Sequence, residues 1–192
     1  MGCLSVFGNR HDEAMVWFKR TLTLDPMFPL PFYYFGWCYE RKRRFDEAIA
    51  AFLKARTFYG DHPVLTCALA CVYAAAGRRS EARQTLATIP SPIQQTSSFH
   101  VATVLAALGE DDEAFAWLET AYHNRDSQLV SLKVEPHFER LRTDPRFNDL
   151  LRRVGLPIGS EVADRPTQEY GLSGDVPLSA SSNSPAGSPN PR

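Results

Sequence analysis

The sequence predicts an all-α fold, a solenoid of antiparallel helix pairs with a C-terminal pair of capping helices. Three observations lead to this prediction. A short string ending in Glu-Ala occurs four times, each string begins a stretch with helical periodicity, and a second apolar helical stretch precedes each of the last three strings. With 192 residues, the chain is long enough to bury a core of this kind.

The four strings set the period of the repeat. They are Asp12-Glu13-Ala14, Asp46-Glu47-Ala48, Ser80-Glu81-Ala82 and Asp112-Glu113-Ala114, and their alanines are 34, 34 and 32 residues apart. A large apolar residue follows each alanine by four positions, which places both on one face of a helix. These residues are Phe18, Phe52, Leu86 and Leu118. Each string also suits a helix start, because Asp or Ser caps free N–H groups and Glu favours the positive end of the helix dipole.

The preceding helix of each pair carries one small residue at a fixed place. Gly36, Ala70 and Ala102 each lie twelve positions before the alanine of the following string. A residue this small lets the backbones of two facing helices approach closely. Gly77 and Gly109 fall in the loop between the helices of a pair, where a C-terminal cap needs positive φ.

This pattern resembles the tetratricopeptide repeat, a 34-residue helix–turn–helix unit that stacks into a right-handed superhelix. The resemblance covers about residues 2–126 and implies about three and a half repeats, assigned here to residues 1–128. The first repeat is shortened, since only Gly2 to Gly8 stand where its first helix belongs. The fourth repeat has a period of 32 and carries Leu105 in place of the family's Tyr.

Residues 129–158 are predicted to form the cap. Asp144-Pro145 is a helix start, and Phe147, Leu150, Leu151 and Val154 follow at helical spacing. The segment resembles the closing part of bacterial tetratricopeptide proteins that carry regulatory domains, so we expect the chain to be the binding end of a larger ancestral regulator. Residues 159–192 are rich in Pro, Ser and Gly and are predicted to be a disordered tail.

Composition and motifs argue against several functional classes. We expect no enzyme and no cofactor, because no phosphate-binding loop, nucleophile elbow or zinc-protease motif occurs. A net charge of −1 argues against nucleic acid, and no apolar run is long enough to cross a membrane. The basic runs 41–44 and 78–79 are interpreted as solvated helix ends, the alternative being an edge that attracts acidic partners. The expected location is the cytoplasm.

The resemblance also implies which residues face the concave groove. They are Tyr33, Trp37, Glu40 and Arg41 in the second repeat, Cys67 and Cys71 in the third, and Phe99 and Thr103 in the fourth. None of these matches the Lys and Asn of the family's carboxylate clamp, so an apolar peptide is the expected ligand. Two alternatives stay open: Cys67 and Cys71 form a metal or redox pair, or several of these residues only pack on a neighbouring helix or the cap.

Two functional hypotheses follow. The first is a non-catalytic module that binds a peptide or partner protein in the groove, with Tyr33, Trp37 and Phe99 as anchors. The second is a structural or regulatory fragment that forms a homodimer, or docks on another domain, through the incomplete first repeat. In that case an apolar helix face around Phe18 is left open.

Overall fold

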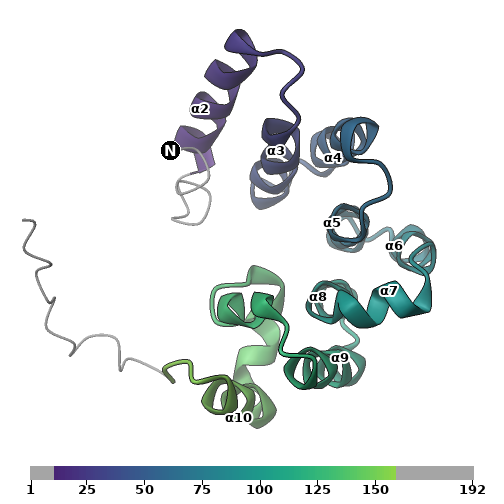
Figure 1. The fold of residues 1–192 in the computed structure, drawn as a ribbon, viewed down its shortest axis with the longest axis vertical. Coiled ribbons are helices and arrows are strands. Elements are labelled where there is room, and N and C mark those ends of the chain that lie inside the picture. Colours follow the sequence, from purple (N-terminus) through teal and green to yellow (C-terminus); the bar gives the residue numbers. More distant parts are fainter. Residues whose placement is uncertain (1–10, 159–192) are drawn as a thin grey trace, which may run out of the picture.

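The computed structural model describes residues 11–158, and within that range the chain is helical with no strand. The helices follow one another around an open arc (Figure 1). Its elements are α2 (His11–Leu24), α3 (Leu30–Arg41), α4 (Phe45–Tyr59), α5 (Pro63–Ala75), α6 (Arg79–Ala87), α7 (Ser91–Thr96), α8 (Ser98–Leu108), α9 (Asp111–His123), the 3-10 helices η1 (Ser127–Ser131) and η2 (Pro136–Thr143), and α10 (Pro145–Val154). The predicted short first helix and the tail, residues 159–192, lie outside the described residues.

The helices pack as neighbouring pairs, which confirms the predicted all-α solenoid. Helices α3 and α4, α5 and α6, and α8 and α9 form the three pairs, while α2 packs on α3 as the second helix of the first repeat. One detail differs from the regular pattern: Thr96 ends α7, and α8 begins only at Ser98. Pro92 lies in the first turn of α7, and Ser97, with φ −116° and ψ 30°, separates α7 from α8.

The small residues of the first helix in each pair lie where two helices approach. Ala70 and Ala102 are fully buried. Gly36 faces the ring of Phe52 so closely that an added Cβ would lie 2.4 Å from Phe52 Cζ. In the α3–α4 pair, the absence of a side chain at Gly36 therefore makes room for the large ring of Phe52.

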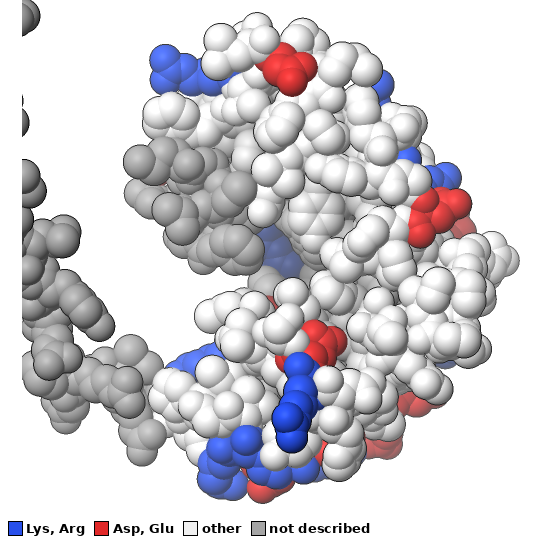
Figure 2. Space-filling model, in the orientation of Figure 1, with Lys and Arg blue, Asp and Glu red and all other residues white. Residues whose placement is uncertain are grey.

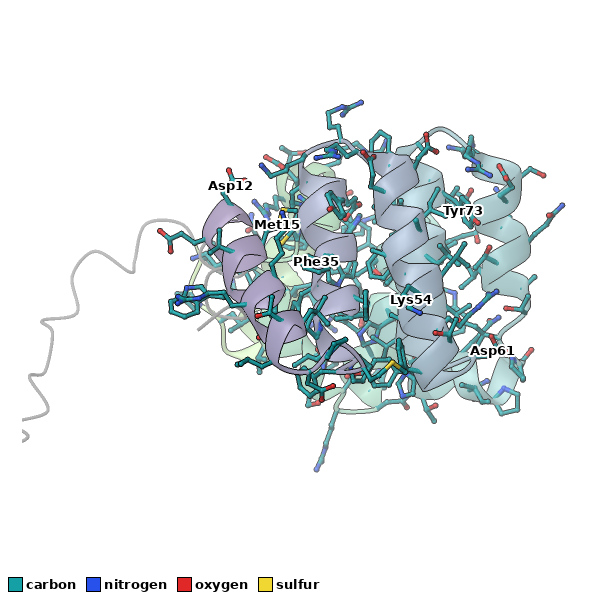
Figure 3. The ribbon with its side chains drawn as sticks, turned by 90° about the horizontal axis from the view of Figure 1, so that it is seen from above. Asp12, Met15, Phe35, Lys54, Asp61 and Tyr73 are labelled. Carbon is teal, nitrogen blue, oxygen red and sulfur yellow. The ribbon has the colours of Figure 1, made fainter. Side chains whose placement is uncertain are left out.

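Helix α2 packs on α3 through aromatic side chains. Figure 3 shows Met15 and Phe35 at the interface between α2 and α3, and both are buried. Phe18 is only 5% exposed, because its ring stacks on Tyr34 at 5.0 Å and meets Phe35 edge-on at 6.0 Å. The expected open face around Phe18 is therefore covered at Phe18 itself.

The cap consists of η2 and α10, preceded by η1. The side chain of Asp144 accepts a hydrogen bond from the backbone N–H of Arg146 at 2.9 Å, as expected for a capping residue at the start of α10. Phe138 of η2 is fully buried between Phe99 and Phe147, with ring centroids 5.4 and 6.4 Å away. The predicted capping pair thus covers the apolar face of the last repeat, as a solenoid end requires.

Arginines of the cap also pair with acids of α9. Arg146 donates to Asp112 at 2.9 Å, and Arg140 and Arg153 pair with Asp111 and Glu119. These pairs are exposed, so each adds little stability, but together they orient η2 and α10 along α9.

Candidate functional site

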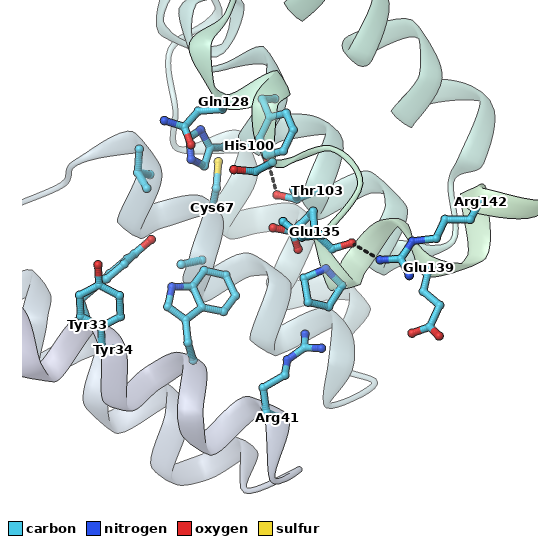
Figure 4. A pocket seen from close by; sticks show the side chains of 17 residues that line it. Tyr33, Tyr34, Arg41, Cys67, His100, Thr103, Gln128, Glu135, Glu139 and Arg142 are labelled. Atoms are coloured by element: carbon cyan, nitrogen blue, oxygen red, sulfur yellow. Dashed lines mark hydrogen bonds between the residues drawn. The ribbon is translucent and has the colours of Figure 1, made fainter. Parts of the chain in front are cut away.

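A cavity of about 490 Å³ lies on the inner side of the arc, between α3, α5, α8 and the segment 128–142 (Figure 4). The space-filling view shows the molecule hollowed on this side, with charged side chains of both signs scattered mostly around the outer edge (Figure 2). The residues that line the cavity are Tyr33, Tyr34, Trp37, Arg41, Val64, Cys67, Ala68, Phe99, His100, Thr103, Gln128, Ser131, Val134, Glu135, Pro136, Glu139 and Arg142.

The structure brings six of the eight predicted groove residues to this cavity. They are Tyr33, Trp37, Arg41, Cys67, Phe99 and Thr103. Glu40 and Cys71 do not line it. Glu40 is 5% exposed and contacts the cap, while Cys71 is fully buried behind Thr103.

One wall of the cavity is aromatic and comes from α3. The rings of Tyr33 and Trp37 meet edge-on at 6.0 Å, and both contact Phe52 behind them at 5.8 and 5.4 Å. Burial raises the pKa of Tyr33 to about 12, so its hydroxyl stays protonated near neutral pH. This wall is rigid, since each ring is held by two others.

The floor of the cavity comes from α5 and α8 and is densely packed. Phe99 and Cys67 are 3% and 1% exposed, and Phe99 packs edge-on against Phe138 of the cap. Phe99 therefore packs on the cap while one part of it faces the cavity, as one of the open alternatives supposed. Because only 3% of Phe99 is exposed, it offers little surface to anchor a peptide.

The two thiols of α5 are buried and held in their protonated form. Burial raises the pKa of Cys67 to about 12 and that of Cys71 well above its ordinary value. Cys71 lies 3.7 Å from the hydroxyl of Thr103. Among residues 11–158, no three or more His, Cys, Asp or Glu side chains gather in a way that would hold a metal ion. The geometry favours packed thiols over a metal or redox pair.

The opposite wall comes from the cap, and the sequence interpretation missed it. Val134, Glu135, Pro136, Glu139 and Arg142 face the repeats across the cavity. Glu135 and Pro136 stand at the start of η2, and nothing in the sequence indicates that this helix enters the groove. Tyr34 and His100, which also line the cavity, follow the predicted groove residues Tyr33 and Phe99 by one position.

His137 connects this wall to α3. Its Nε2 lies 2.9 Å from Glu40 Oε1 and its Nδ1 lies 2.6 Å from Glu135 Oε1, with the His137 and Glu40 side chains 6% and 4% exposed. Burial opposes the charged imidazolium, but hydrogen bonds to the two carboxylates outweigh it and raise the pKa of His137 to about 9. Burial likewise opposes ionisation of Glu135, yet its bonds from His137 hold its pKa below the ordinary value.

Charges at the cavity mouth are balanced. Arg41 and Arg142 lie beside Glu135 and Glu139 (Figure 4), and Arg142 donates to the backbone carbonyl of Glu135 at 3.2 Å. Arg41 Nη2 is 3.6 Å from Glu40 Oε2. The mouth therefore has no strong preference for an acidic or a basic ligand.

The basic runs at the repeat turns are tied into local pairs. Arg44 pairs with Glu47 and lies over the ring of Tyr39, 5.0 Å from its centroid. One repeat later, Arg78 pairs with Glu81 and lies 4.7 Å from the centroid of Tyr73. This recurrence favours a structural role at the helix end for both arginines.

Comparisons with known proteins identify the repeats. The family model described as tetratricopeptide repeat matches residues 40–108. No curated protein and no solved structure was found to match the chain. Within the described part of the chain, no helix combines the length and the apolar character that crossing a bilayer requires.

Proposed function

We propose that this tetratricopeptide repeat protein, whose family match covers residues 40–108, is a non-catalytic module. It binds a peptide or a segment of a partner protein in the pocket between the repeats and the cap. Repeats of this family generally mediate protein–protein interaction. The observation that carries the proposal is the cavity of about 490 Å³ with its rigid aromatic wall of Tyr33 and Trp37. A cavity of this size accepts a few side chains of a peptide, not a whole folded partner.

The chemistry of the lining favours an uncharged, apolar peptide segment. Aromatic rings, Val64, Ala68 and the buried thiol of Cys67 make up the inner lining, while Thr103, Gln128 and Ser131 offer polar atoms for backbone groups of the peptide. Aromatic anchors in desolvated pockets supply most of the binding energy in such interfaces. The proposal assigns no reaction, cofactor or metal, and no nucleic acid or membrane partner.

The test uses a randomised twelve-residue peptide library displayed on phage and panned against the full chain. We expect enriched peptides to carry aromatic or aliphatic side chains. Val134→Asp should weaken their binding by about tenfold or more, because a carboxylate beside Glu135 would face the apolar ligand. Isothermal titration calorimetry with the enriched peptides measures the effect.

The chain offers a matched control for this substitution. Val130 is 71% exposed, as Val134 is 65% exposed, but Val130 does not line the cavity. Val130→Asp should leave affinity unchanged. The double variant Tyr33→Ala/Trp37→Ala should lose binding while circular dichroism stays helical. Equal affinities of the Val130 and Val134 variants would contradict the pocket assignment.

A second proposal, self-association through the first repeat, has a specific observation in its favour. Apolar side chains of α2 and the loop after it are exposed: Val16 57%, Trp17 42%, Leu24 88% and Met27 68%. We expect sedimentation equilibrium to show dimers at tens of micromolar, and Leu24→Glu/Met27→Glu to remove them. Leu53→Glu, on exposed α4 surface, is the control. A strictly monomeric parent would count against this proposal.

The remaining expectations are kept as proposals. The chain divides into a solenoid assigned to residues 1–128, a cap at 129–158 and a segment 159–192, of which residues 1–10 and 159–192 lie outside the described range. Its location is the cytoplasm.

A further inference from the structure

A contact across the groove joins two parts of the chain that repeat packing would leave apart. In a solenoid each repeat packs mainly on its neighbours. Here His137 of η2 contacts Glu40 of α3, 97 residues earlier in the chain. The imidazole also meets the ring of Trp37, with centroids 5.8 Å apart. The contact therefore spans the third and fourth repeats.

We propose that Glu40, His137 and Glu135 form a latch that closes the solenoid across its groove and creates the pocket. In the closed form, Val134, Glu135 and Pro136 face α3 and complete the cavity. In the open form, the repeats stay folded but the wall from the cap moves away, leaving an open groove. The inference concerns the conformation of this chain and stands independently of what the pocket binds.

The latch has the features of a two-state element. Its closing contacts are charge-assisted hydrogen bonds from one imidazolium to two carboxylates, which are strong when buried. Glu40 Oε2, however, is buried and accepts no hydrogen bond from the described residues, although Arg41 Nη2 lies 3.6 Å away. An unsatisfied buried acceptor costs free energy in the closed form, so opening regains hydration for that oxygen. The hydrogen bonds of His137 favour the closed form, while the hydration regained by Glu40 Oε2 lowers the free-energy cost of opening.

Several ionisable groups surround the latch. From α3 come Arg41, whose Nη2 is 3.6 Å from Glu40 Oε2, and Tyr33. From α5 come Cys67 and Cys71, and from α8 comes His100, all close enough to act on the latch or on its neighbours. Burial keeps Tyr33 and both thiols protonated near neutral pH and lowers the pKa of His100. His137 is therefore the latch group whose charge changes first as pH rises above neutral.

The sign of the pH dependence follows from the direction of each shift. His137 has its pKa raised to about 9 from 6.5, so its stabilising effect is complete below 6.5 and is lost as pH rises through 9. The pKa of Glu135 is lowered from 4.5, so its effect is complete above 4.5 and is lost as pH falls below that value. The latch is closed near neutral pH and opens under alkaline conditions.

Trp37 provides a direct optical readout. In the full chain with Trp17→Phe and Trp117→Phe, only Trp37 emits, and a protonated imidazole in contact quenches indole fluorescence. We expect the emission to rise with pH with a midpoint near 9. Glu40→Gln should lower the midpoint by about one unit, a tenfold change in the proton dissociation constant. His137→Gln should abolish this transition and leave only tyrosine ionisation.

Glu139→Gln is the matched control, because Glu139 belongs to the same wall but contacts neither His137 nor Glu40 in any hydrogen bond or ion pair of the described residues. Its midpoint should equal that of the parent. A parent midpoint near 6.5, or no shift in Glu40→Gln, would overturn the latch. If Glu40→Gln does not fold, the parent midpoint and the His137→Gln curve still decide the matter.

Hydrogen exchange at pH 7 separates latch opening from general destabilisation. In Glu40→Gln, amides of residues 133–137 should exchange about tenfold faster, while those of α9 stay within about twofold of the parent. Equal acceleration in both regions would mean that Glu40 only supports the fold. That result would overturn the proposal.

Discussion

Replacing Gly36 by alanine should lower the free energy of unfolding by about 2 kcal/mol, although alanine is the better helix former. An added Cβ would lie 2.4 Å from Phe52 Cζ and 2.6 Å from both Cε atoms. The Phe52 ring is fully buried and contacts Tyr33 and Trp37, so it has no free space to move into. Overpacking of this kind outweighs the gain in helix propensity.

The neighbouring repeats show which second substitution should compensate for an alanine at position 36. Where the second repeat has Gly36 and Phe52, the third has Ala70 and Leu86, and the fourth has Ala102 and Leu118. Phe52→Leu alone should also destabilise, because it leaves a cavity over the glycine. The double variant Gly36→Ala/Phe52→Leu should lose less than the sum of the single variants, with a coupling of at least about 1 kcal/mol.

Urea unfolding of the parent, both single variants and the double variant measures this coupling. The converse pair, Ala70→Gly with Leu86→Phe, tests the same rule in the next repeat. Strict additivity in both cycles would show that the two positions are not matched in size. The cycle also bears on the pocket, since Phe52 supports the aromatic wall from behind.

The repeat itself was readable from the sequence because local rules and global packing agree. A 34-residue period, acids in the first turn and small residues at fixed places all predict the pairs that the structure shows. The predicted capping role of Asp46, Ser80 and Asp112 is wrong, because all three lie inside the first turn of their helices. The turn of the second repeat is the exception. Gly77 and Gly109 have φ of 77° and 79°, but the equivalent residue is Arg43, with φ 57°. Glycine marked the later turns, whereas nothing in the sequence marked this one.

The site was only half predictable. The resemblance to the tetratricopeptide repeat implied that Tyr33 and Trp37 face the groove, and both line the cavity. Glu40 was also assigned to that face, but its partner His137 is 97 residues away, and no spacing rule predicts such a contact. The same holds for Val134 and Glu135. A wall made by a terminal segment depends on the curvature of the whole arc.

Phe138→Ala should be the most destabilising single substitution in the cap, lowering the free energy of unfolding by about 3–5 kcal/mol. The ring is fully buried and lies between Phe99 of α8 and Phe147 of α10. Its loss leaves a cavity where three parts of the cap and last repeat meet. Guanidinium chloride unfolding, followed by circular dichroism, measures the change.

Two variants bracket this expectation. Phe138→Leu keeps most of the side-chain volume and should lower the free energy of unfolding by less than half as much. Glu139 is the next residue and is exposed, so Glu139→Ala should change the free energy of unfolding by no more than about 0.5 kcal/mol. A loss below about 1 kcal/mol for Phe138→Ala would mean that η2 is not an integral part of the cap.

A large loss of stability in Phe138→Ala would also limit how far the latch can open. If Phe138 firmly anchors η2 on α8, opening must be confined to the Val134–His137 end of the segment, so that His137 leaves Glu40 while Phe138 stays in place.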